Sequence, residues 1–103
     1  MQQFDIAENL NQRTRSRYPF VVVLQHDRID GLITVVVAPL TQVSALPELD
    51  RLHPTATFNR QSYRVIVEEL AAVDRRTLGQ IVGSMEAERY SIIAAIDLLF
   101  TGI

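Results

Sequence analysis

The side chains that could do chemistry do not combine into a catalytic set. The chain has two histidines, His26 and His53, and neither has a partner at the spacing of a metal site. Glu68 and Glu69 are adjacent, so on a strand their carboxylates would point to opposite faces and could not work as a pair. The sequence has no glycine-rich phosphate loop, nucleophile elbow or zinc-protease motif. It therefore predicts a protein without catalytic residues, metal ligands or cofactors.

The composition predicts one small globular domain over residues 1–103. The mass is 11.7 kDa, and 48% hydrophobic with 21% charged residues is globular rather than disordered composition. Cysteine and lysine are both absent, which excludes disulfides, thiol chemistry and Schiff-base catalysis. The net charge of −2 argues against a protein that binds nucleic acid directly through excess positive charge.

No segment predicts contact with a membrane. No apolar run approaches the roughly 20 residues that a membrane-spanning helix needs. The N-terminus has neither the basic start nor the apolar centre of a signal peptide. We therefore expect a cytoplasmic protein.

Two apolar runs, Tyr18–Leu24 and Leu32–Leu40, predict neighbouring β-strands. Both are rich in β-branched residues, and the loop between them ends in Asp30-Gly31, a pair that favours a hairpin. The runs are nearly continuous rather than alternating, which predicts that both faces of these strands are covered. Pro39 lacks a backbone donor, so the second strand is expected to stop there or to lie at an edge.

A second strand pair is predicted at Thr55–Phe58 and Tyr63–Val67, joined by a polar turn. Residues 68–73 are interpreted as a strand end and loop, and Gly79 and Gly83 as further breaks. Earlier in the chain, the polar stretch from Glu8 to Arg17 predicts a mobile loop. It carries three arginines that are interpreted as solvated, with contact to an acidic partner as the alternative: Arg13, Arg15 and Arg17.

The final segment predicts a helix from Met85 to Thr101. Its apolar residues recur at three- and four-residue steps, which places them on one stripe of a helix: Ile92, Ile93, Ile96, Leu99, Phe100 and Ile103. Gly102 follows the last turn and suits a left-handed stop. Together the elements predict a mainly β domain with a C-terminal α-helix.

Several segments match one known family, in order and over nearly the whole chain. They are Ser16-Arg17-Tyr18, Gln25-His26-Asp27-Arg28-Ile29-Asp30, Val36-Val37-Ala38-Pro39-Leu40, His53-Pro54, Ser62-Tyr63-Arg64-Val65 and the C-terminal run from Ile92 to Ile103. These segments resemble the CcdB toxins, which poison DNA gyrase and end in an isoleucine- and leucine-rich helix followed by Phe-Trp-Gly-Ile.

The resemblance implies a homodimer with an SH3-like β-barrel core, a small extra sheet and no enzymatic activity. It also implies that the toxin binds the DNA gyrase A subunit and traps gyrase on cleaved DNA. The implied second partner is a cognate disordered antitoxin, together with which such toxins regulate their own transcription. Direct binding of nucleic acid by the toxin alone is not expected.

The resemblance also implies which residues make these contacts. The gyrase-binding set falls at the end of the helix: Asp97, Thr101, Gly102 and Ile103. Thr101 stands where the family has tryptophan, so the large ring that could stack on a target arginine is missing. Arg28 and Ile29 match loop isoleucines of the family and are the expected antitoxin contacts.

Two alternatives stay open at this point. The departure at Thr101 allows a diverged family member that binds an antitoxin and no longer poisons gyrase. The same barrel is also used by MazF- and Kid-like toxins that cleave messenger RNA. In that case one set of residues could stabilise charge during phosphodiester cleavage: Arg64, Asp74, Arg75 and Arg76.

Overall fold

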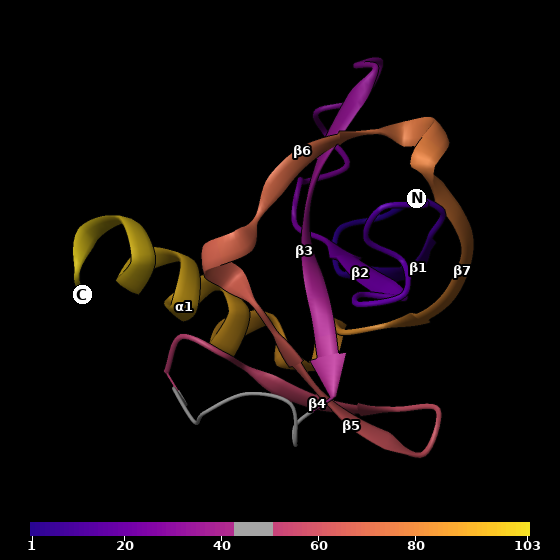
Figure 1. Ribbon diagram of the computed structural model, residues 1–103. Helices are drawn as coiled ribbons and strands as arrows, with labels where there is room; N and C mark the ends of the chain where they lie inside the picture. The colour runs from indigo at the N-terminus through magenta and orange to yellow at the C-terminus, as the bar shows by residue number, and fades with distance from the viewer. Residues whose placement is uncertain (43–50) are drawn as a thin grey trace.

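One curled antiparallel sheet and one C-terminal helix make up the computed structural model, which describes residues 1–42 and 51–103 (Figure 1). The strands are β1 (Asp5–Asn9), β2 (Phe20–Val23), β3 (Thr34–Gln42), β4 (Thr55–Phe58), β5 (Gln61–Val65), β6 (Ala71–Asp74) and β7 (Leu78–Ser84). Short 3-10 helices, η2 (Val67–Glu69), η3 (Arg75–Thr77) and η4 (Glu86–Glu88), precede or join later elements, and α1 spans Arg89–Thr101. The predicted mainly β fold with a C-terminal helix is confirmed.

The long strand β3 organises the sheet, whose order is β4-β5-β3-β2-β1-β7. On one side β3 pairs with β2, and on the other its first half pairs with β6 and its second half with β5. Pro39 lies inside β3, which has partner strands on both sides, so the prediction that the strand stops there or lies at an edge is wrong. The Pro39 carbonyl accepts a hydrogen bond from Ile66 N. The Pro39 nitrogen faces the same edge of β3 as this carbonyl, at the point where the partner strand changes from β5 to β6. The sheet therefore needs no backbone N–H donor at Pro39.

Side chains from both faces of β2 and β3 are buried, as the continuous apolar runs predict. On one face Val22, Ala38 and Leu40 join the main core cluster, which α1 covers with Ile92 and Ala95. On the other face lies a second, smaller cluster, which consists of Ala7, Val21, Val23, Val35 and Val37 with Val73 and Leu78 packed against it. The sheet therefore has two apolar faces, of which α1 covers one.

The predicted helix is confirmed with a later start. Met85 is buried ahead of it and donates its backbone N–H to Phe4 O at 2.8 Å, after which η4 leads into α1 at Arg89. At the other end Gly102 has φ 74° and donates its N–H to Leu98 O at 3.0 Å. This left-handed stop is the one that the sequence predicts.

Strands β1, β6 and β7 were not predicted. The interpretation of Gly79 and Gly83 as breaks is wrong, because both lie inside β7, which pairs with β1. A Cβ at Gly79 would lie 2.9 Å from Glu8 Oε1, and one at Gly83 would lie 3.0 Å from Phe58 Cδ2. These glycines serve close packing between strands rather than a turn.

Candidate protein-interaction site

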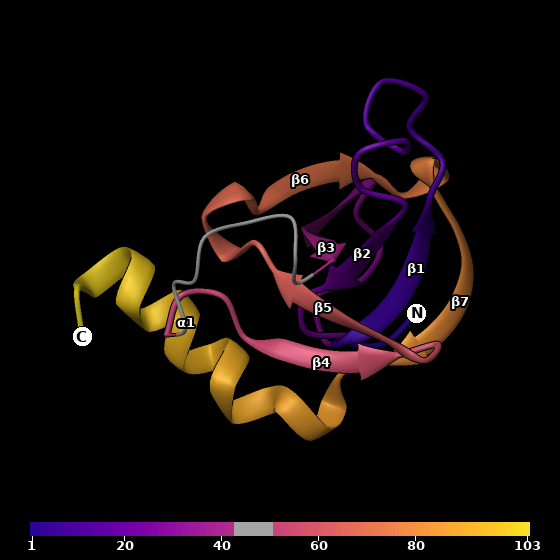
Figure 2. The same cartoon turned by 60° about the horizontal axis from the view of Figure 1, so that its bottom comes forward.

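The C-terminal end of α1 projects beyond the sheet (Figure 1, Figure 2). The helix is anchored through Ile92 and Ala95, whereas Phe100 is 67% exposed and Ile103 is 82% exposed. The left-handed Gly102 sets the direction in which Ile103 leaves the helix. The structure thus presents two large apolar side chains on a rigid support, in the arrangement of a protein-binding anchor.

The residues that were predicted to contact gyrase lie together at this end. Asp97, Thr101, Gly102 and Ile103 are all exposed. The Thr101 hydroxyl donates to the Asp97 carbonyl at 2.6 Å, the usual backward hydrogen bond of a threonine in a helix. Because this bond occupies the hydroxyl proton, Thr101 offers a partner little more than its methyl group and an acceptor oxygen.

Sequence reasoning missed Tyr90, which is 83% exposed at the start of α1. Tyr90, Ala94, Asp97 and Thr101 follow each other at steps of four, three and four residues, and therefore share one solvent-facing stripe of the helix. The spacing was visible in the sequence. What the sequence did not show is that this stripe is uncovered along its whole length.

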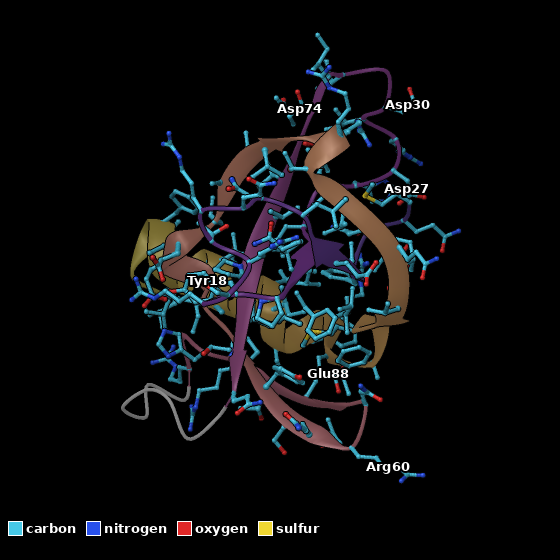
Figure 3. All side chains as sticks on the ribbon, turned by 45° about the vertical axis from the view of Figure 1, so that its right-hand side comes forward. Tyr18, Asp27, Asp30, Arg60, Asp74 and Glu88 are labelled. Carbon is cyan, nitrogen blue, oxygen red and sulfur yellow. The ribbon has the colours of Figure 1, made fainter. Side chains whose placement is uncertain are left out.

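The predicted antitoxin contacts lie in another part of the molecule. Arg28 and Ile29 belong to the loop between β2 and β3, near Asp27 and Asp30 (Figure 3), and this loop is remote from the end of α1 (Figure 1). Ile29 is exposed, as are its neighbours Leu32 and Ile33. The structure therefore places the two predicted interaction sites apart within one copy of the chain.

The residues of the RNA-cleavage alternative are not brought together. Arg64 pairs with Thr41 at the end of β3, whereas Asp74 pairs with Thr34 at its start. Thr34 and Thr41 are seven positions apart in sequence, which is about 23 Å along the strand at the usual rise per residue. Arg64 is also almost fully buried.

Asp74 and its neighbouring arginines have structural contacts of their own. Arg76 Nη2 lies 2.8 Å from Asp74 Oδ2, and the Asp74 carboxylate also accepts a hydrogen bond from Arg76 N. These hydrogen bonds lower the pKa of Asp74 to about 2. Arg75 Nε donates to Leu32 O at 2.7 Å and so ties η3 to the loop before β3.

His53 is buried and bonded to a carboxylate. Its Nε2 lies 2.7 Å from Glu68 Oε1 and 2.9 Å from Glu68 Oε2. His26, in contrast, accepts the Arg28 N–H at Nδ1. Over residues 1–42 and 51–103, no group of three or more acidic, histidine or cysteine side chains could hold a metal ion. In the same ranges, no helix is both long enough and apolar enough to cross a membrane.

Comparison with known proteins first defines the class of fold. The "Mycobacterium tuberculosis toxin MazF-mt6" superposes with a TM-score of 0.76 at 17% sequence identity, and the match covers 93% of this chain and 95% of that chain. This likeness concerns the fold alone. A family model described as "CcdB protein" matches residues 3–102. The chain belongs to the CcdB family, and is accordingly a toxin of a toxin–antitoxin system with an antitoxin as its partner.

Proposed function

We propose that this CcdB-family toxin acts by binding DNA gyrase through the C-terminal end of α1, without making or breaking a covalent bond. The observation that carries the proposal is the exposure of Phe100 and Ile103 beside the rigid stop at Gly102. Burial of a large apolar side chain is worth about 1.5 to 3 kcal/mol, so two such side chains in a partner's pocket can act as its main anchors. Tyr90 and Asp97 extend the same surface along the helix.

We further propose that the toxin acts as a cytoplasmic homodimer on the gyrase A subunit and takes part with its antitoxin in regulating their transcription. Membership of the CcdB family supports these assignments. Arg28 and Ile29 remain our proposed antitoxin contacts, and their distance from the end of α1 fits a partner that spans more than one surface.

The test is induced expression in a gyrase-sensitive host. Growth should stop and gyrase should accumulate on cleaved DNA, and deletion of Thr101–Ile103 should abolish both effects while circular dichroism shows an intact fold. Ile81→Ser is a matched control, because it removes an exposed apolar side chain from β7, away from α1. Growth arrest that survives loss of the three terminal residues would refute the proposal. Normal growth together with retained antitoxin binding would instead favour a diverged, non-poisoning member.

RNA cleavage is the second candidate function, and the likeness of fold to a MazF toxin is the observation that favours it. The separation of Arg64 from Asp74 along β3 speaks against the catalytic set considered above. Incubation of the purified protein with messenger RNA distinguishes the two functions. Degradation that persists after removal of Thr101–Ile103 would assign the activity to the barrel rather than to the helix end.

A further inference from the structure

A cavity of about 380 Å³ lies between α1 and the segment that leads into β4 (Figure 2). Among the described residues it is lined by Arg51, His53, Pro54 and Thr55 on one side and by Ser91 and Ala94 of α1 on the other. Its volume falls within the range of small-molecule sites, about 300 to 1,000 Å³. We name it the α1–β4 cavity. It contains neither the apolar side chains at the end of α1 nor the proposed antitoxin contacts.

The exposed polar side chains of the α1–β4 cavity are hydrogen-bond donors. Arg51 has a guanidinium group, and Thr55 and Ser91 have hydroxyl groups. Within residues 1–42 and 51–103, none of these three side chains forms a hydrogen bond or a salt bridge. The described lining also contains no carboxylate, so no acid in the wall neutralises the charge of Arg51. The cavity therefore offers donors that the described chain leaves without an acceptor.

His53 forms the buried part of the same wall. Its side chain is 3% exposed, and its Nε2 donates to Glu68, with Oε1 at 2.7 Å and Oε2 at 2.9 Å. In the described part of the chain its Nδ1 has no hydrogen-bond partner. A buried polar atom without a partner destabilises a fold, and an apolar residue of similar size would avoid this cost. The histidine therefore does more than fill space: it holds the Glu68 carboxylate, which would otherwise repel an anion.

A second cavity, of about 220 Å³ on the sheet face opposite α1, has the opposite character. Its floor is aliphatic, and its rim includes Glu69, whose Oε2 accepts the Tyr18 hydroxyl at 2.7 Å. A negatively charged ligand would meet the Glu69 carboxylate there. The α1–β4 cavity is therefore the better place for an anion.

The donors of the α1–β4 cavity suit a phosphate group. A phosphate monoester carries a charge of about −1.5 to −2 at neutral pH and presents three acceptor oxygens. The fork of an arginine can bind two of these oxygens in parallel, and a hydroxyl can donate to the third. A carboxylate has only two oxygens and would leave one of the three donors without an acceptor.

The size and lining of the cavity indicate what the phosphate is attached to. A cavity of about 150 Å³ can hold benzene, so the α1–β4 cavity has room for a phosphate and a body of about one ring. The described lining contains no aromatic side chain on which a nucleobase could stack. A sugar or polyol needs no such platform, and its hydroxyl groups can exchange hydrogen bonds with Thr55 and Ser91.

We propose that the α1–β4 cavity binds the phosphate monoester of a small sugar or polyol, with the phosphate on Arg51 and between the hydroxyls of Thr55 and Ser91. Such a ligand would connect α1 to the segment before β4. The site is separate from the proposed gyrase contact, and the inference does not depend on it.

The probe is ribose 5-phosphate, titrated into the full-length protein and followed by NMR of backbone amides. Saturable shifts should appear at Thr55, Ser91 and Ala94, and the thermal midpoint should rise with the concentration of the probe by mass action. Inorganic phosphate should bind about tenfold more weakly, because it buries no sugar body. Ribose without phosphate should cause no shift at the same concentration.

Three variants separate binding of the phosphate from support of the fold. Arg51→Gln should weaken binding about tenfold, whereas Arg60→Gln, which removes an exposed arginine at the β4–β5 turn, should leave it unchanged. Glu68→Gln keeps an acceptor for His53 Nε2 but removes a negative charge beside the cavity, so it should strengthen binding about twofold. A merely structural His53–Glu68 contact would give no such gain.

Four outcomes would overturn the proposal. The first is no saturable binding of ribose 5-phosphate, or equal losses for Arg51→Gln and Arg60→Gln. The second is equal affinity for sulfate, which would show a site for any ion. The third is tighter binding of a carboxylate such as citrate at the same amides. The fourth is weaker binding by Glu68→Gln at an unchanged thermal midpoint of the free protein. Deletion of Thr101–Ile103 should leave binding of the probe intact, so this inference and the gyrase proposal can fail separately.

Discussion

At the scale of single residues, Thr101 limits how strongly the proposed gyrase site at the end of α1 can bind. Its hydroxyl proton is taken up by Asp97 O, and its side chain has no aromatic face. Thr101→Trp should strengthen binding to the gyrase A subunit about tenfold in calorimetry, because a ring adds buried area and a cation–π contact. Thr101→Val is the matched control and should give no gain. Equal affinities of the tryptophan and valine variants would contradict the transfer of the family's contact to this position.

Asp74 should make the free energy of unfolding depend on pH only in the acidic range, below about pH 4. Its pKa is lowered from 3.8 to about 2 by hydrogen bonds from Arg76, so the folded state favours the charged carboxylate. The stabilisation is present above pH 3.8 and is lost as the pH falls toward 2. The free energy of unfolding, measured with urea between pH 2 and 5, should therefore change less with pH in Asp74→Asn than in the wild type. This variant keeps an acceptor for Arg76 N. A variant with the wild-type pH dependence would show that the carboxylate contributes nothing.

Arg60 occupies a backbone conformation that suits glycine. Asn59 and Arg60 have φ of 52° and 65° and join Phe58 to Gln61 in a two-residue turn, shorter than the polar turn expected from sequence. Left-handed conformations cost a side-chain-bearing residue about 1 to 2 kcal/mol, partly offset by the greater freedom of glycine when unfolded. Arg60→Gly should therefore stabilise the fold by about 0.5 kcal/mol in chemical denaturation. Thr57→Gly, in the adjacent strand β4, should destabilise it by about 1 kcal/mol; stabilisation by both changes would refute the argument.

At the scale of elements, the packing between β7 and the β4–β5 hairpin depends on a missing side chain. A Cβ on Gly83 would lie 3.0 Å from Phe58, whose ring packs edge-to-face on Phe20 with centroids 5.2 Å apart. Gly83→Ala should destabilise the protein by about 1 to 3 kcal/mol through overpacking. Gln80→Ala, an exposed site on the same strand, is the control. Phe58→Leu should recover part of the loss, and purely additive effects in this double-mutant cycle would exclude the clash as the cause.

Whether an element could be predicted from the sequence depends on whether its cause is local or distant in the chain. The helix and strands β2, β3, β4 and β5 carry their own signals, namely apolar periodicity, β-branched runs and the Gly102 stop. Gly79 and Gly83 break the local pattern of β7, because their reason lies in the distant side chains of Glu8 and Phe58. Strand β6 reads Ala-Ala-Val-Asp and becomes a strand only by pairing with β3. Such non-local causes leave no trace within a short window of sequence.

The candidate sites also divide into one with local sequence signals and one that depends on residues far apart in the chain. The resemblance to the CcdB toxins implied contact residues at the end of the helix, and the structure shows that Phe100 and Ile103 are exposed there beside the Gly102 stop. The cavity on the sheet face opposite α1 could not be predicted, because its lining joins Thr14 and Tyr18 of the loop 10–18 to Glu69 and Val73 across the sheet. Composition alone assigned that loop to solvent, whereas its hydrogen bonds make it one wall of a cavity.

At the scale of the whole molecule, each copy of the chain has a complete core. The Cα radius of gyration is 12.7 Å, close to the roughly 13 Å expected for a compact chain of about 100 residues. Large apolar side chains nevertheless stay outside this core at the projecting end of α1. A proposed homodimer would therefore join two folded bodies rather than complete an unfolded one.

A homodimer of two separately folded chains should dissociate into folded monomers on dilution. Sedimentation should show a species of twice the 11.7 kDa mass of the chain at high concentration, and the monomer at low concentration should keep its circular dichroism spectrum. Because association stabilises only the folded state, the thermal midpoint should rise with protein concentration by mass action. A midpoint independent of concentration, with one monomeric species throughout, would exclude the homodimer. It would also require a single copy of the helix end to supply the whole gyrase contact.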